Sequence, residues 1–127
     1  MNRLMFHMPL IAILIVVGCF HGSDPKNLCG NYFLNVDTRD SLFVNLDGSY
    51  IHKYSSKQGE IFQSSGDWEY DSIRQRVIFK DFRFFSDMGA DDLPPGEWRP
   101  KIDYSNSNEV RLIYSSEDNV YFKKEAP

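Results

Sequence analysis

Most of the chain after residue 29 alternates between apolar and polar positions, a pattern typical of strands with one buried face. No stretch there repeats apolar residues at the helical period of about 3.6 positions. Clusters of Gly, Asn, Asp and Ser separate the alternating runs. The pattern predicts about eight strands, at residues 30–36, 41–46, 49–54, 60–70, 74–79 with its continuation 80–85, 97–104, 110–114 and 120–123.

Asp47-Gly48 is the strongest hairpin signal in the chain. A two-residue loop here would pair Leu42 with Lys53 and bury the lysine. A three-residue loop with Gly48 in the left-handed conformation pairs Leu42 with His52 instead. We favour the three-residue loop, which turns His52 inward. The inner face of this hairpin then gathers Leu42, Val44, Tyr50 and Tyr54.

The run at residues 60–70 has the cleanest alternation. One of its faces carries Phe62, Ser64, Gly66, Trp68 and Tyr70. Small residues in mid-strand leave space inside a sheet or mark a bend. The interior is therefore either a filled core or an aromatic cavity, and both are known in small barrels. The candidate ligand-lining residues are Tyr50, His52, Tyr54, Phe62, Trp68 and Tyr70.

Short strands joined by short turns favour an all-β fold, an antiparallel up-and-down meander rolled into a small barrel or half-barrel. Closure removes exposed strand edges. A β-sandwich is the alternative, although the Cys…Trp…Cys spacing of immunoglobulin domains is missing. We expect a turn at Thr38–Asp40, an acidic loop at Ser86–Gly96, and an edge strand at 97–104, because Pro100 cannot donate to a ladder.

The first 18 residues have the pattern of a secretory signal peptide. Arg3 precedes an apolar run at residues 8–17, and small residues follow it. The run is shorter than the ~20 residues that span a bilayer. The sequence therefore predicts export and removal of residues 1–18.

Val16-Val17-Gly18-Cys19 resembles the lipobox of bacterial lipoproteins. The resemblance implies cleavage before Cys19, a diacylglycerol thioether on its sulfur and usually an acyl (palmitate-type) group on its nitrogen. Residues 19–28 then form a lipidated tether and 29–127 the domain. The alternative is a disulfide between Cys19 and Cys29, the only two cysteines. The two states exclude each other, and lipidation, which we favour, leaves Cys29 as a packed, reduced thiol.

The resemblance also bears on location. Two or three acyl chains give stable anchoring, whereas one chain binds a membrane only marginally. Phe20, rather than an aspartate, after the lipidated cysteine implies sorting to the outer membrane of a Gram-negative envelope.

Charge and composition exclude some partners. Without Arg3, the mature part has 13 basic and 18 acidic residues, a net charge of about −5. This balance argues against nucleic acid, which needs a basic surface, and against electrostatic binding to anionic lipid. Ten Phe, seven Tyr and two Trp favour sheet over helix.

Candidate chemistry is sparse. The mature chain has His21 on the tether and His52 in the domain, and no Gly-x-Ser-x-Gly motif. We expect His52 to be a core-edge residue bonded to a neighbour. Asp87, Asp91 and Asp92 are oxygen ligands of the kind that Ca²⁺ prefers, but their spacing does not match an EF-hand loop. We expect neither an enzyme nor a cofactor or metal.

The motifs Gly30-x-Tyr32, Leu42-x-Val44, residues 47–50 (Asp-Gly-Ser-Tyr) and Gly66-x-Trp68 resemble the lipocalin-like barrels of small bacterial lipoproteins. They are also similar to the N-terminal barrel of envelope-stress and copper-homeostasis lipoproteins. The copper-associated group carries a Cys-x-x-Cys pair after its first strand, where this chain has Asp37-Thr-Arg-Asp40. The resemblance implies a barrel without that metal or redox role.

Two functions follow as expectations. In the first, the domain is a non-catalytic binding module on a lipid anchor that contacts an envelope protein through Asp87–Gly96 or an open sheet edge. In the alternative, it is a lipocalin-like carrier whose aromatic interior holds a small apolar ligand.

Overall fold

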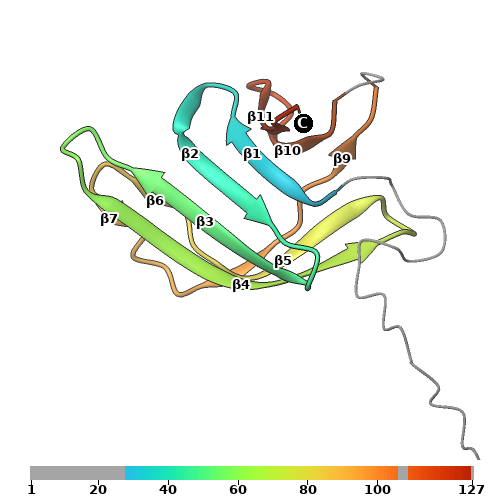
Figure 1. The fold of residues 1–127 in the computed structure, drawn as a ribbon, viewed down its shortest axis with the longest axis horizontal. Coiled ribbons are helices and arrows are strands. Elements are labelled where there is room, and N and C mark those ends of the chain that lie inside the picture. Colours follow the sequence, from blue (N-terminus) through green and yellow to red (C-terminus); the bar gives the residue numbers. More distant parts are fainter. Residues whose placement is uncertain (1–27, 106–108, 127) are drawn as a thin grey trace, which may run out of the picture.

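The structure, a computed structural model, describes residues 28–105 and 109–126 as an all-β domain (Figure 1). The described residues contain no helix, which confirms the predicted fold class. The strands are β1 (Gly30–Leu34), β2 (Asp37–Val44), β3 (Ser49–Ser55), β4 (Ile61–Asp71), β5 (Arg76–Phe82), β6 (Phe85–Ser86), β7 (Gly89–Ala90), β8 (Gly96–Trp98), β9 (Ile102–Asp103), β10 (Arg111–Ser115) and β11 (Val120–Lys124).

Nine strands form one curled antiparallel sheet in the order β8-β5-β4-β3-β2-β1-β11-β10-β9. Most neighbours in this sheet are also neighbours in sequence, as expected of a meander. The β6 and β7 strands pair only with each other and form a small hairpin between β5 and β8. In Figure 1 this hairpin lies at one end of the sheet, and β1 begins toward the other.

The segment 96–103 joins the two edges of the sheet. Its β8 part pairs with β5, and its β9 part pairs with β10. Between them, Lys101 forms a bridge to Arg76, and the Pro100 carbonyl accepts a 3.1 Å bond from the Val77 N–H. The Lys101 carbonyl accepts a bond from Ile113 on the opposite side. The predicted edge position is found for β8 and β9, which stand at the two ends of the sheet order. The residues between them differ from the prediction, because the Pro100 carbonyl accepts a bond and residues 100–102 have partners on both sides.

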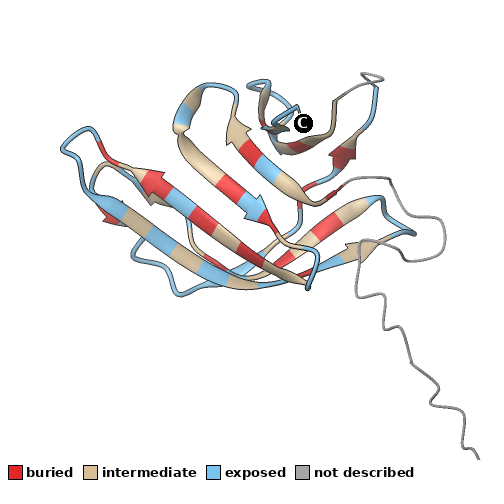
Figure 2. Cartoon of the chain, viewed as in Figure 1, coloured by how far each residue is buried: buried red, intermediate tan, exposed pale blue. Residues whose placement is uncertain are grey.

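The β2–β3 hairpin has the predicted register. Leu42 lies opposite His52, Val44 lies opposite Tyr50, and Gly48 has a φ of 89° in the three-residue loop. All four paired residues are buried. Figure 2 shows the resulting alternation of buried and less buried positions along these strands.

The first turn lies earlier than predicted. Leu34 pairs with Asp37, so the chain reverses at Asn35 and Val36, and the predicted turn residues Thr38–Asp40 belong to β2. A register shift beside Phe33 and Leu34 accompanies this tight reversal. Asp40 therefore lies on a strand, directly beside β3.

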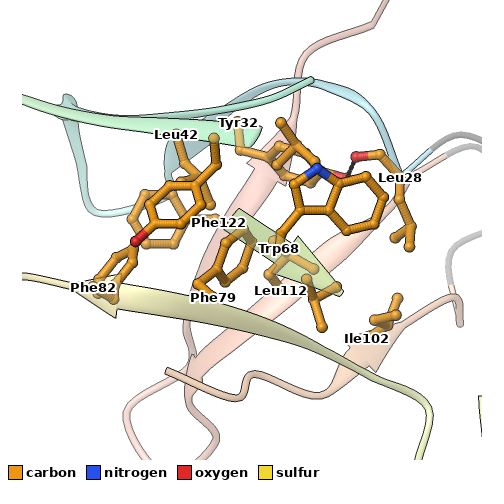
Figure 3. Packing of buried hydrophobic residues seen from close by; sticks show 12 residues of the cluster. Leu28, Tyr32, Leu42, Trp68, Phe79, Phe82, Ile102, Leu112 and Phe122 are labelled. Carbon is orange, nitrogen blue, oxygen red and sulfur yellow. Dashed lines mark hydrogen bonds between the residues drawn. The ribbon is translucent and has the colours of Figure 1, made fainter. Parts of the chain in front are cut away.

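The core is a continuous cluster of aromatic and aliphatic side chains (Figure 3). Phe79 and Phe82 both point inward although three positions separate them, because Asp81 between them has a φ of 56° and the β5–β8 register shifts there. The left-handed residue acts as a bulge that restores the inward direction of the strand. The members of the core cluster are Leu28, Tyr32, Leu42, Val44, Tyr50, Trp68, Val77, Phe79, Phe82, Ile102, Leu112 and Phe122.

Gly66 allows a close crossing in the core. A Cβ atom there would lie 2.4 Å from the Lys80 carbonyl oxygen and 3.0 Å from the Tyr50 hydroxyl. The missing side chain leaves room for Tyr50 to donate a 2.5 Å hydrogen bond to that same carbonyl. Gly66, one of the small residues on the inner face of β4, thus allows the backbone at Lys80 to approach β4 closely.

Replacing Gly66 with alanine should destabilise the domain by about 1–3 kcal/mol, the usual cost of overpacking, because the new methyl group meets a backbone oxygen. Urea unfolding measures the change. The control is Gly96→Ala, where nothing lies within 4 Å, and it should change stability by less than about 0.5 kcal/mol. Equal stability of the two variants would contradict the crossing.

Candidate functional site

The six candidate ligand-lining residues share the inner face of β3 and β4. Their polar atoms are used within the domain: the Trp68 Nε1–H donates to the Asn45 carbonyl at 2.9 Å, and the Tyr54 hydroxyl donates to Asp87 at 3.0 Å. Burial raises the pKa of Tyr50, which keeps its hydroxyl a neutral donor. Tyr50, His52, Tyr54 and Trp68 are buried, and Phe62 and Tyr70 are half-buried.

Aromatic rings from four strands meet inside the barrel. The His52 ring stacks on Phe82 at 4.6 Å, Phe82 contacts Trp98 at 4.8 Å, and Trp98 contacts Phe122 at 5.5 Å. These residues come from β3, β5, β8 and β11, so the contacts cross the interior from one wall to another. Side chains of the domain itself occupy this part of the interior.

His52 is the centre of a buried polar cluster. Its side chain is 2% exposed, its Nε2 lies 2.6 Å from Asp40 Oδ1, and its Nδ1 lies 2.8 Å from the Arg83 carbonyl oxygen. The expectation that His52 is bonded to a neighbour is confirmed. The ring therefore ties β2, β3 and the segment after β5 together.

Ser64 lies opposite His52 in the β3–β4 register. Its hydroxyl is the one buried side-chain polar atom without a hydrogen-bond partner among the described residues. Because His52 already faces Asp40 and Arg83, the histidine does not activate this hydroxyl. The arrangement is therefore not that of a nucleophilic serine with its base.

A second polar cluster attaches the β6–β7 hairpin to the barrel. Asp87 Oδ1 accepts hydrogen bonds from the Lys57 N–H at 2.9 Å, from Tyr54 Oη at 3.0 Å and from Arg39 Nη1 at 3.0 Å. These donors, the Lys57 N–H above all, hold the pKa of Asp87 below its usual value. Sequence analysis took 86–96 as one solvated acidic loop, but part of it is this hairpin, and Asp87 is an anchor rather than a solvated charge.

The outer end of the hairpin and the connection to β8 expose apolar side chains. Met88 is 96% exposed and Leu93 is 68% exposed. Phe84, just before β6, and Tyr114 of β10 are partly exposed and in ring contact with each other, with centroids 5.6 Å apart. We call Phe84, Met88, Leu93 and Tyr114 the distal apolar residues.

Sequence reasoning missed both polar clusters. Asp40 had been assigned to a turn, and Arg39 and Asp87 are 48 positions apart. Arg83 takes part through its backbone oxygen, which no residue pattern reveals. Basic residues of β5 pair with acids of the neighbouring β4: Lys80 contacts Glu69 at 2.8 Å and Arg76 contacts Asp71 at 3.3 Å.

Cys29 is disulfide-bonded in the structure, which differs from the reduced thiol expected with a lipidated Cys19. Cys19, the chain's other cysteine, lies outside the described residues, as do the predicted signal peptide and most of the predicted tether. The state of Cys29 thus distinguishes the two expectations for Cys19.

Within residues 28–105 and 109–126, no group of three or more His, Cys, Asp or Glu side chains is placed to hold a metal ion. The same part of the chain has no helix of a length and apolar character suited to crossing a membrane. No family model, curated protein or solved structure matches this chain.

Asp87→Asn should reduce the loss of stability on acidification. A carboxylate whose pKa is lowered on folding stabilises the domain above its unfolded pKa, and this contribution disappears as the pH falls through the lower, folded value. Urea midpoints at about pH 7 and about pH 3 test this, since free Asp titrates near 3.9. Between about pH 7 and about pH 3, the urea midpoint of the wild type should fall by more than that of the variant. Asp92→Asn, an exposed control in the same connection, should behave like the wild type.

Proposed function

We propose that this chain is a lipid-anchored lipoprotein of the bacterial envelope whose β domain is a non-catalytic binding module for an envelope protein. The anchor is Cys19, and Phe20 after it favours the outer membrane. Because a thioether and a disulfide at Cys19 exclude each other, the proposed anchored form differs from the structure, in which Cys29 is disulfide-bonded. The observation that carries the proposal is the placement of the start of β1 and the β6–β7 hairpin at opposite ends of the domain.

The register defines these two ends. Gly30 pairs with Val44, and the Trp68 indole bonds to Asn45, so the start of β1 lies with the turn between β2 and β3. Asp40 pairs with Tyr54 toward the other end, where Tyr54 bonds to Asp87 of the hairpin. Figure 1 shows the same separation between the start of β1 and β6–β7. A membrane anchor before Leu28 would therefore leave the distal apolar residues facing away from the bilayer.

The packing supports surface binding over the carrier alternative. Ring contacts cross the interior, and the polar atoms of Tyr50 and Trp68 already bond to backbone carbonyls. By contrast, Met88 and Leu93 contribute apolar area that the domain itself does not cover. Exposed apolar surface that the protein itself does not cover is characteristic of protein interaction sites when it is contiguous.

Cys19→Ser should move the protein from the membrane fraction to the soluble fraction and remove the acyl mass. Mass spectrometry of the intact wild type measures the acyl mass. A wild type without acyl mass, or a Cys19→Ser variant that stays in the membrane fraction, would refute the lipid anchor.

A photo-crosslinking amino acid at Met88 should capture a defined envelope protein in cells that make the full-length lipoprotein. The matched control is Ile73, which is 89% exposed in the turn between β4 and β5, at the tether end. Crosslinking at position 88 and not at 73 supports a distal docking surface. Equal capture at both positions, or none at either, contradicts it.

A further inference from the structure

The segment 83–90 is held on the barrel at two separate points. At the first, the Arg83 carbonyl faces His52 Nδ1, and Phe82 and Phe85 lie against the imidazole at 4.6 and 5.0 Å. At the second, Asp87 bonds to β2, β3 and the Lys57 N–H. Both attachments use ionisable groups, and the segment carries Phe84 and Met88 of the distal apolar residues.

The first attachment requires a particular number of protons. A carbonyl oxygen only accepts hydrogen bonds, so the bond to Arg83 needs a hydrogen on Nδ1. An ionised Asp40 also only accepts, so the 2.6 Å contact with Nε2 needs a second hydrogen. The His52–Asp40 pair therefore holds two protons when both contacts are made.

Loss of one of these protons breaks a specific contact. The remaining hydrogen goes to Nε2, because a bond to a carboxylate is stronger than a bond to a neutral carbonyl. The lone pair of Nδ1 then faces the lone pairs of the Arg83 oxygen at 2.8 Å, and the two repel. The partly buried carbonyl then loses the donor that it has in this structure, which costs stability.

We propose that the His52–Asp40 pair is a proton-dependent latch: doubly protonated it holds segment 83–90 on the barrel, and singly protonated it releases the Arg83 carbonyl and loosens the segment. The latch regulates the distal apolar residues, and in this respect it rests on the proposed function. The Asp87 attachment keeps the hairpin tethered during release, because Asp87 remains ionised as the pH rises above neutral.

Of the groups around His52, Asp40 is the carboxylate in contact with its ring. From β4 the ring faces Ser64 across the register, and from β11 it faces Phe122; neither ionises near neutral pH. On β10, burial first and then the Asp40 and Asp91 carboxylates raise the pKa of Tyr114, so its hydroxyl stays neutral. On β2, Arg39 is engaged with Asp37 and Asp87.

Hydrogen exchange of the intact protein, followed by mass spectrometry from about pH 5 to about pH 9 across the usual range of histidine titration, tests the latch. Rates are corrected for the intrinsic pH dependence of amide exchange. Peptides covering 83–90 should exchange about tenfold faster or more at the upper pH. This is the effect expected from losing one hydrogen bond that involves a charged group, here the bond from His52 to the Arg83 carbonyl. Peptides from β1 serve as the internal reference.

Asp40→Asn is the decisive variant. A neutral His52 can then donate from Nδ1 to Arg83 and accept at Nε2 from the asparagine amide, so both contacts survive without the second proton. Segment 83–90 should stay protected across the whole range. Asp87→Asn, the control at the other attachment, should raise exchange at every pH but keep the pH response. A wild type without a pH response, or an Asp40→Asn variant that responds as the wild type does, would overturn the latch.

The ring nitrogens give a second readout that needs no variant. ¹⁵N NMR of His52 should show protons on both nitrogens at the lower pH and loss of the Nδ1 proton as the segment loosens. An Nδ1 that keeps its proton throughout contradicts the mechanism. Neither measurement involves a partner, so failure of the latch and failure of the docking surface are distinguishable.

Discussion

The pairing of segment 96–103 with strands on both sides is the constraint on which the rest of the structure depends. It connects β5 to β10, the two strands that would otherwise end the sheet. Closure brings the inner faces of the sheet together, so that Trp98 meets both Phe82 and Phe122. A sheet held this way has little exposed ladder for uncontrolled pairing. Contacts with other molecules are then left to side chains at its ends.

The interior is specialised for packing. Its aromatic residues carry polar atoms, and these bond to nearby carbonyls: Tyr32 to Leu28 at 2.6 Å, Tyr50 to Lys80 and Trp68 to Asn45. Such bonds allow large amphipathic rings to be buried without an unsatisfied donor. The same side chains that suggested a ligand cavity from sequence thus have structural partners, and the ionisable residues gather instead where segment 83–90 meets the barrel.

The parts of the fold that depend on local chemistry were predictable. Gly48 and the need to keep Lys53 out of the core determined the hairpin loop, and with it the burial of His52. The errors arose where backbone geometry decided the outcome. Pro100 predicted the edge position of β8 and β9, but not the bond that its carbonyl accepts from Val77. The left-handed Asp81 that turns Phe82 inward has no signal in the alternation. The candidate site was least predictable, because its contacts join distant residues and use the Arg83 backbone oxygen.

The central claim is that this domain acts through its distal surface and not through a cargo in its interior. A native mass spectrum of the domain, begun at Phe20 and purified from a bacterial periplasm, tests this most directly. The account predicts a bare protein mass, because the rings of β3, β5, β8 and β11 already occupy the interior. A bound apolar mass that survives purification would contradict it and support the carrier.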